Sequence, residues 1–213
     1  MNIYDATFPI HEAMAVWPGD PTPRQQLLSA IHEGATATTG AIFMSLHTGT
    51  HVDAPAHVLP NGISVEQLPS PQLIGPATVV EVPEHHHKIT VEFLHTLHFP
   101  PGARVLFKTR NTWRWKTEGL HFTPDYVAFT PEAATYLIEQ QVALIGIDGF
   151  SVDEYAASDL PVHRQFLQHN VVIVELLNLT RVVPGEYFLI TAPLKVANAD
   201  GAPARVFLFQ QMQ

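Results

Sequence analysis

The sequence contains no cysteine, which excludes several kinds of structural, metal-binding and catalytic site. Without thiols there is no disulfide scaffold, no thiolate metal site and no cysteine nucleophile. Basic residues are also few, since 11 Lys and Arg stand against 20 Asp and Glu and the formal net charge is −9. We therefore expect no electrostatic binding to nucleic acid or to an anionic membrane surface.

Long hydrophobic runs are missing as well. The longest apolar runs, such as Val171 to Val174, are far shorter than the ~20 residues that a membrane-spanning helix needs. The first ten residues also lack a basic leader followed by an apolar stretch, so a secretory signal is not expected. The 213 residues are 46% hydrophobic and 15% charged, which predicts a globular chain. We expect one soluble, cytoplasmic domain spanning residues 1–213.

The pattern of apolar residues predicts an α/β fold with a mixed β-sheet. Helices are expected after Thr90 and Thr130, which precede helical sequences as capping residues, and from Pro161 to Gln168. Short β-branched runs predict strands at Ile3–Phe8, Ala41–Leu46, Ala77–Val82, Arg104–Lys108, Val142–Ile147, Val171–Leu176, Tyr187–Thr191 and Arg205–Phe209.

Histidine is abundant, with 13 residues, and three of these lie close together in the segment from His47 to His57. With Asp53 they form a set of nitrogen and oxygen ligands that suits Zn²⁺ or Mn²⁺. In an extended strand His47 and His51 would lie about 13 Å apart, so the chain must turn between them, and Gly49 permits this. His51 and Asp53 then project from one face of a strand, and Pro55 redirects His57 toward them. The spacing predicts a metal site, although three unrelated histidines in a polar loop are the alternative.

Two further residues are candidates for the same site. Glu175 interrupts a run that otherwise reads as a buried strand, and a buried carboxylate is costly unless it is paired or bound to a metal. It could instead face outward from an edge strand or pair with Arg181. His163, on the preceding predicted helix, could belong to the site or lie on the helix surface.

The segment from His47 to His57 resembles the motif His-x-Gly-Thr-His-x-Asp-x-Pro-x-His of the metal-dependent cyclase family, which includes bacterial kynurenine formamidases and isatin hydrolases. The resemblance covers nearly the whole chain. Further family landmarks are Trp17 to Asp20, Leu144 to Asp148, Pro184 to Tyr187 and Ala192 to Lys195.

This resemblance implies roles for particular residues. His47 and His51 would bind a first divalent ion, Asp53 and Glu175 would bridge to a second, and His163 would bind that second ion. Some relatives carry a single ion, often manganese, so one or two ions are implied. By the same resemblance His57 would donate and accept protons, and Trp17 would line the substrate pocket. Trp17 could equally pack beside the turn at Pro18. The implied fold is a swivelling β/β/α domain, usually dimeric or tetrameric.

The resemblance implies a metal-dependent hydrolase that cleaves an amide C–N bond, most specifically an arylformamidase acting on N-formyl-L-kynurenine in tryptophan catabolism. The alternatives are a cyclic amide hydrolase of the isatin hydrolase type, a catalytically silent metal-binding relative, and a histidine-rich metal buffer. Residues 149–163 depart from the formamidase pattern, which leaves the substrate open, although we expect a small, aromatic amide.

Four other features are assigned no firm role. Trp113 and Trp115 lie in a segment, 109–119, that we expect to be an exposed amphipathic loop or a lid. The run His85 to His87 is expected to be a surface loop. Asp148 follows a predicted strand, where it could support the site or cap a turn.

Overall fold

Short runs of β-branched and aromatic residues form one large sheet in the structure, a computed structural model that describes residues 1–210. Such residues favour strands because their side chains pack well on a pleated surface. The eight strands of this main sheet are β1 (Asn2–Asp5), β4 (His51–Asp53), β5 (Ile74–Glu81), β7 (Arg104–Lys108), β9 (Leu144–Ile147), β10 (Val172–Glu175), β11 (Gly185–Pro193) and β12 (Gly201–Gln210).

The main sheet is mixed and closes on itself. Its order is β1-β12-β11-β5-β7-β9-β10-β4, and β12 also pairs with β4. Strands β5, β7, β9 and β10 run parallel to one another, whereas the remaining pairings are antiparallel. Closure leaves β4 paired on both sides, so this three-residue strand lies in the interior of the sheet. The predicted α/β fold with a mixed sheet is confirmed.

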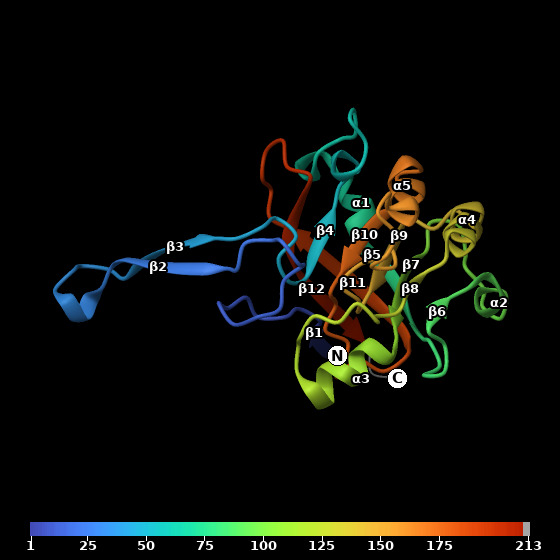
Figure 1. Cartoon of the computed structure of the whole chain (residues 1–213), viewed down its shortest axis with the longest axis horizontal. Coiled ribbons are helices and arrows are strands. Elements are labelled where there is room, and N and C mark those ends of the chain that lie inside the picture. The colour runs from blue at the N-terminus through green and yellow to red at the C-terminus, as the bar shows by residue number, and fades with distance from the viewer. Residues whose placement is uncertain (211–213) are drawn as a thin grey trace.

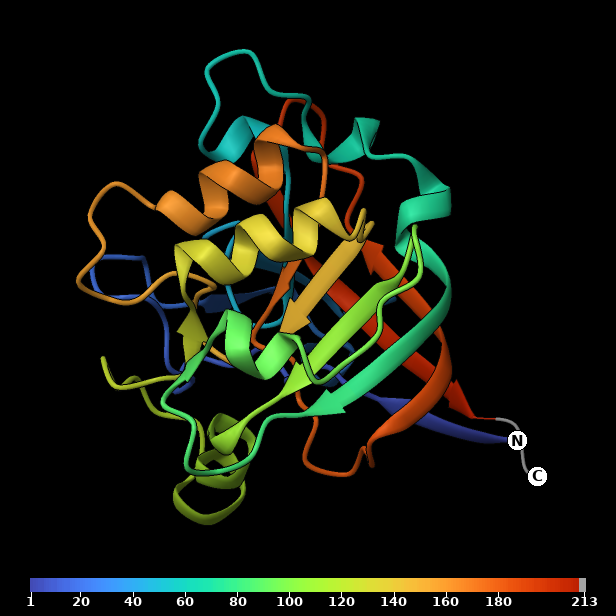
Figure 2. The ribbon, with the colours of Figure 1, turned by 90° about the vertical axis from the view of Figure 1, so that its right-hand side faces the viewer.

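Helices cover one face of the sheet. Figure 2 shows α4 (Pro131–Glu139) and α5 (Pro161–Gln168) side by side over it, with α2 (Val91–Leu94) below them. The core under the helices contains Phe107, Phe129 and Phe166, whose rings meet edge to face. A second core fills the inside of the closed sheet with aliphatic side chains from alternate strand positions.

The remaining elements are short. They are α1 (Ser70–Leu73), the paired strands β6 (Lys88–Ile89) and β8 (Ala128–Phe129), and the single-turn 3-10 helices η1 (Ile31–Glu33), η2 (Pro55–His57) and η3 (Val65–Gln67). No helix within residues 1–210 has both the length and the apolar character needed to cross a membrane.

The segment expected to be a loop or lid is instead a helix, α3 (Arg110–Glu118). Thr109 caps it by accepting a hydrogen bond from the amide of Asn111. Trp115 is buried and donates its indole N–H to the carbonyl of Asp148 at 2.8 Å, whereas Trp113 is 52% exposed. Trp115 therefore holds the helix against the residue that follows β9, and the prediction of an exposed loop was wrong.

Strands β2 (Arg24–Ser29) and β3 (Thr39–Phe43) form a separate two-stranded ribbon, which we call the arm. Figure 1 shows the arm extending from the body of the molecule. Nearly all its residues are exposed, including several large apolar ones: Leu27, Leu28, Ile31, Ile42 and Phe43. The sequence pattern predicted a strand at Ala41–Leu46 and missed β2.

Most predicted elements are present, with shifted ends. The predicted strand at Arg104–Lys108 and the predicted helix at Pro161–Gln168 match β7 and α5 residue for residue. The helix after Thr90 is shorter than expected and ends at Leu94. The run His85 to His87 lies in a loop, as expected.

Candidate functional site

Strand β4 places two of the candidate ligands on one face. His51 lies opposite Glu175 of β10, and both His51 and Asp53 are buried because β10 and β12 flank the strand. Side chains alternate along a strand, so His51 and Asp53 share one face while Val52 packs into the core on the other. The predicted shared face is therefore present in the structure.

The turn predicted before β4 brings His47 back to the strand. Gly49 has a φ of +68°, in the left-handed region that glycine adopts without strain. The rings of His47 and His51 are 5.0 Å apart, and Nδ1 of His47 lies 2.8 Å from Oδ1 of Asp53. His47, which an extended chain would separate from His51 and Asp53, thus converges with them at β4.

Glu175 and His163 join this group. Glu175 is 4% exposed and its Oε1 accepts a hydrogen bond from the amide of Val152, so it is neither an outward residue of an edge strand nor a partner of Arg181. His163 is 3% exposed and faces inward from α5, so it is not a helix-surface residue. Its Nε2 lies 3.2 Å from Oε1 of Glu175 and 3.4 Å from Oδ2 of Asp53.

Two histidines are oriented by hydrogen bonds on their far sides. Nδ1 of His51 donates to the carbonyl of Gly49 at 2.8 Å, and Nδ1 of His163 lies 2.6 Å from the carboxylate of Asp153. These bonds leave Nε2 of each ring as the atom that faces the buried carboxylates. Metal-binding histidines are commonly held by such a partner on the second nitrogen.

The cluster fits a divalent cation. Nε2 of His51 lies 3.3 Å from Asp53 and 3.4 Å from Glu175, close to the ~3.4 Å between ligand atoms around a tetrahedral zinc with ~2.1 Å bonds. Among residues 1–210, Oδ2 of Asp53 is a buried oxygen with no hydrogen-bond donor. Such an oxygen is costly unless a cation binds it. The donor set of imidazoles and carboxylates therefore suits a divalent metal.

The electrostatics of the cluster agree with a cation site. Burial opposes charge on His51, but the nearby carboxylate of Asp53 raises its pKa to about 10. Burial likewise opposes charge on His163, and the charge of Glu175 is the main influence that raises its pKa. The two buried carboxylates are therefore stabilised by positive charge nearby, which a divalent cation would supply in place of protons on the histidines.

His57 lies beside this cluster, at the end of η2. Its ring centre is 4.3 Å from that of His47 and 5.5 Å from that of His163. Burial is the main influence that lowers the pKa of His57, so the ring is neutral near pH 7 and able to accept a proton. The predicted return of His57 toward the site is therefore observed.

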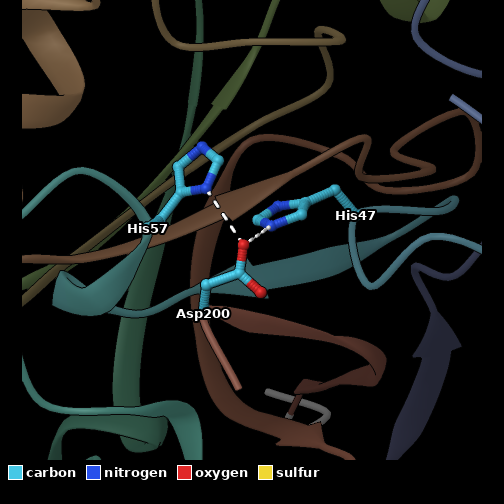
Figure 3. A group of neighbouring side chains, drawn as sticks. All are labelled: His47, His57 and Asp200. Atoms are coloured by element: carbon cyan, nitrogen blue, oxygen red, sulfur yellow. Dashed lines mark hydrogen bonds and ion pairs between the residues drawn. The ribbon is translucent and has the colours of Figure 1, made fainter. Parts of the chain in front are cut away.

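Asp200 was not predicted and lies at the same site. Figure 3 shows His47 and His57 both directed at one of its oxygens, with Nε2 of His47 at 3.0 Å and Nδ1 of His57 at 3.5 Å from Oδ2. The hydrogen bond with His47 is the main influence that lowers the pKa of Asp200 to about 2. For His47, burial is offset by its bonds to Asp200 and Asp53, and its pKa is raised to about 9.

A cavity of about 200 Å³ opens over the cluster. Trp17 lines it and also packs against Phe122 and Tyr155, with ring centres 5.6 and 5.5 Å away, so pocket lining and packing both apply. Phe150 and Leu176 add further apolar wall. The result is a pocket with Trp17, Phe150 and Leu176 in its apolar wall and the polar groups of the cluster beneath it.

Asp148 lies apart from the cluster. It is fully buried and accepts hydrogen bonds from Thr109, Asn111 and Thr112 at the start of α3. Of the two roles open to it from the sequence, capping is the one observed. It holds α3 and the loop that leads to Phe150.

Two site residues, Asp153 and Asp200, were not predicted from the sequence. Asp153 accepts the amide hydrogens of Val162 and His163 at the start of α5, yet it lies ten residues before His163 in an irregular segment. Asp200 precedes Gly201 between two strands, where Asp-Gly ordinarily indicates only a turn. Pairing of β12 with β4 brings it to the site, and no local pattern signals that pairing.

Comparison with known proteins shows which proteins this chain resembles in sequence and fold. Residues 4–154 match the family described as "Putative cyclase". A kynurenine formamidase from Salinibacter ruber (strain DSM 13855 / M31) is 37% identical over 98% of this chain and 97% of its own length. A solved structure described as a potential metal-dependent hydrolase with cyclase activity is 34% identical, with a TM-score of 0.87 over 100% of this chain and 99% of its own. Isatin hydrolase A from Labrenzia aggregata, bound to benzyl benzoate, is 26% identical, with a TM-score of 0.83 over 99% and 94%.

Proposed function

This chain belongs to the putative cyclase family, and from that premise we propose that it is a metal-dependent hydrolase that cleaves an amide C–N bond. Its substrate is N-formyl-L-kynurenine, which yields L-kynurenine and formate in tryptophan catabolism. The observation that carries this proposal is the convergence of three imidazoles and two buried carboxylates beneath a pocket that Trp17 and Phe150 line. The near full-length similarity to a kynurenine formamidase supports the choice of substrate.

The proposed ligands divide into two groups that share Asp53. His47, His51 and Asp53 would hold one ion, and Asp53, His163 and Glu175 would hold a second. The ion is Zn²⁺ or Mn²⁺, with one or two per chain, and elemental analysis of the purified protein measures both identity and number. When bound, such an ion would lower the pKa of a bound water to roughly 7 and polarise the carbonyl that is attacked.

The remaining steps fall to side chains of this protein. His57 takes a proton on its imidazole during attack on the carbonyl and returns it to the departing aryl amine, which is a poor leaving group unless it is protonated. Such assistance typically contributes about 10²–10⁴ in rate. Trp17 and Phe150 offer flat apolar faces to the aryl ring of the substrate.

Replacement of His57 separates proton transfer from metal binding. We expect His57→Ala to retain the wild-type metal content and to lose about 10²–10⁴ in kcat with N-formyl-L-kynurenine. His87→Ala, which removes an exposed histidine from the surface loop, is the matched control and should behave as wild type. Loss of most bound metal from His57→Ala would contradict its role as a proton carrier.

A second candidate activity is the opening of a cyclic amide such as isatin, which the similarity to isatin hydrolase A supports. Both reactions use the same cluster, so assays of the metal-loaded protein with each substrate decide between them. Inactivity on both, with a full complement of metal, would instead indicate a catalytically silent relative. A histidine-rich buffer would bind ions weakly and without fixed stoichiometry.

We further propose that residues 1–213 act as one domain, in the cytoplasm, within a homodimer or homotetramer. The arm supports association, because an isolated two-stranded ribbon is only marginally stable in water and here exposes Leu28 by 59% and Phe43 by 65%. Light scattering after gel filtration measures the molar mass and so tests the oligomeric state. Phe43→Ser should lower the molar mass, whereas Gln26→Ser, an exposed polar control on the same arm, should leave it unchanged.

A further inference from the structure

Asp200 lies at the site without belonging to the proposed ligand groups around Asp53. Its Oδ2 lies within hydrogen-bonding distance of both Nε2 of His47 and Nδ1 of His57, the first and last residues of the segment 47–57, which we call the histidine segment. Figure 3 shows the two rings approaching this single oxygen from different directions. One carboxylate oxygen therefore connects a proposed metal ligand with the proposed proton carrier.

The backbone holds Asp200 in place. Its carbonyl accepts a hydrogen bond from the amide of Ala54 at 2.9 Å, and the next residue, Gly201, pairs with Asp53 in the sheet. Gly201 also lets His47 approach closely, because a Cβ at this position would lie 2.8 Å from Cε1 of that ring. The carboxylate thus stands on a fixed strand end, which favours a defined geometry for what it contacts.

We propose that Asp200 is a positioning residue, which fixes the ring orientation and the tautomer of His57. A carboxylate accepts hydrogen bonds and donates none when ionised, so the nitrogen of His57 that faces Asp200 carries the hydrogen. The other nitrogen, Nε2, then keeps its lone pair for the proton to be moved. The separation of 3.5 Å is long, as catalytic hydrogen bonds often are before substrate binds.

The tautomer matters for the proton balance. During attack on the carbonyl, one proton moves from water to Nε2 of His57, and the same proton passes to the nitrogen of the leaving amine as the C–N bond breaks. If Nε2 already carried a hydrogen, the ring could not take that proton at this atom. Asp200 excludes this unproductive form by making Nδ1 the protonated nitrogen, which is the role of the carboxylate in other His–Asp pairs.

Kinetics of the metal-loaded enzyme with N-formyl-L-kynurenine test one half of the proposal, and this half rests on the proposed function. Asp200→Ala should lower kcat by about 10–100-fold, as loss of an orienting partner typically does, while KM and metal content stay near wild type. Asp200→Asn should recover part of the loss, because its amide oxygen can still accept from Nδ1. Asp159→Ala, which removes an exposed carboxylate that contacts neither ring through a hydrogen bond, is the control. Unchanged kcat in Asp200→Ala would refute the proposal, and loss of most metal would make Asp200 a ligand instead.

Nitrogen NMR of the zinc-loaded protein with labelled histidine tests the other half without substrate. The signals of His57, identified by their absence in His57→Gln, should show a hydrogen on Nδ1 in the wild type and a mixture of tautomers in Asp200→Ala. An unchanged tautomer in the variant would overturn the proposal even if the enzyme is active. The NMR result stands by itself if the substrate proves to be a different amide.

Discussion

Replacing Asp148 with Asn exchanges one carboxylate oxygen for an amide nitrogen and leaves the shape of the side chain nearly unchanged. In the structure Oδ2 accepts hydrogen bonds from the backbone amides of Thr109 and Thr112 at 2.8 and 3.0 Å. Oδ1 accepts hydrogen bonds from the Thr109 hydroxyl and the side-chain amide of Asn111 at 2.8 and 3.3 Å. All four partners can donate. An asparagine must present its own NH₂ group to two of them.

The size of the effect follows from these contacts. Hydrogen bonds to charged groups contribute about 1.5–3 kcal/mol each, and Asp148→Asn removes or reverses two of them. Burial raises the pKa of Asp148, so its ionised form carries a desolvation cost that the substitution relieves in part. We expect a net loss of about 2–4 kcal/mol, which lowers the melting temperature of a chain of this size by about 5–15 °C.

Urea unfolding followed by circular dichroism measures the change directly. Asp159→Asn makes the same chemical replacement at an exposed position and should alter stability by less than ~0.5 kcal/mol. If Asp148→Asn is equally neutral, the native carboxyl must be protonated and must donate a hydrogen bond itself. That result would refute the assignment of four donors to an ionised Asp148.

The other predictions concern the site and its supports. Glu175→Gln keeps the size of the side chain but removes a charge, and should weaken binding of Zn²⁺ at least ~10-fold by calorimetry. Gly201→Ala should destabilise the fold by about 1–3 kcal/mol through overpacking, whereas Gly40→Ala on the exposed arm has room for a Cβ. Trp115→Ala should cost about 3–5 kcal/mol of unfolding free energy, and Trp113→Ala, at an exposed position, much less. Removing metal with a chelator should lower the melting temperature, because a ligand that binds only the native state stabilises it; an unchanged value would show that the purified chain held none.

The sequence predicted the elements whose stability is local or whose burial is complete. β7 has three buried apolar residues at its centre and β10 has three before Glu175, and α4 begins with a threonine cap and a proline, so a few consecutive residues are enough to predict each element. The histidine segment was predicted for a similar reason, because the turn at Gly49 and the alternation along β4 act over fewer than ten residues.

The missed features depend on partners that are distant in the chain. α3 has few apolar side chains and is held by Asp148, which follows it by some thirty residues. β2 buries neither face and so carries no alternating pattern. The role of Asp200 arises only when β12 pairs with β4, 148 positions apart at Gly201 and Asp53. Local patterns hold no information about such pairings.

The double pairing of β4 has a consequence for how the polypeptide is made. His51 and Asp53 leave the ribosome well before the strands that flank them, because β10 and β12 follow β4 by more than a hundred residues. Long-range pairing of this kind is slow, because the loop must close before its contacts are formed. Until β10 and β12 have been made, the segment from His47 to His57 lacks the strands that bury it in the folded protein. The cluster around Asp53 is therefore complete only after both β10 and β12 have paired with β4, which makes assembly of the site a late step of folding.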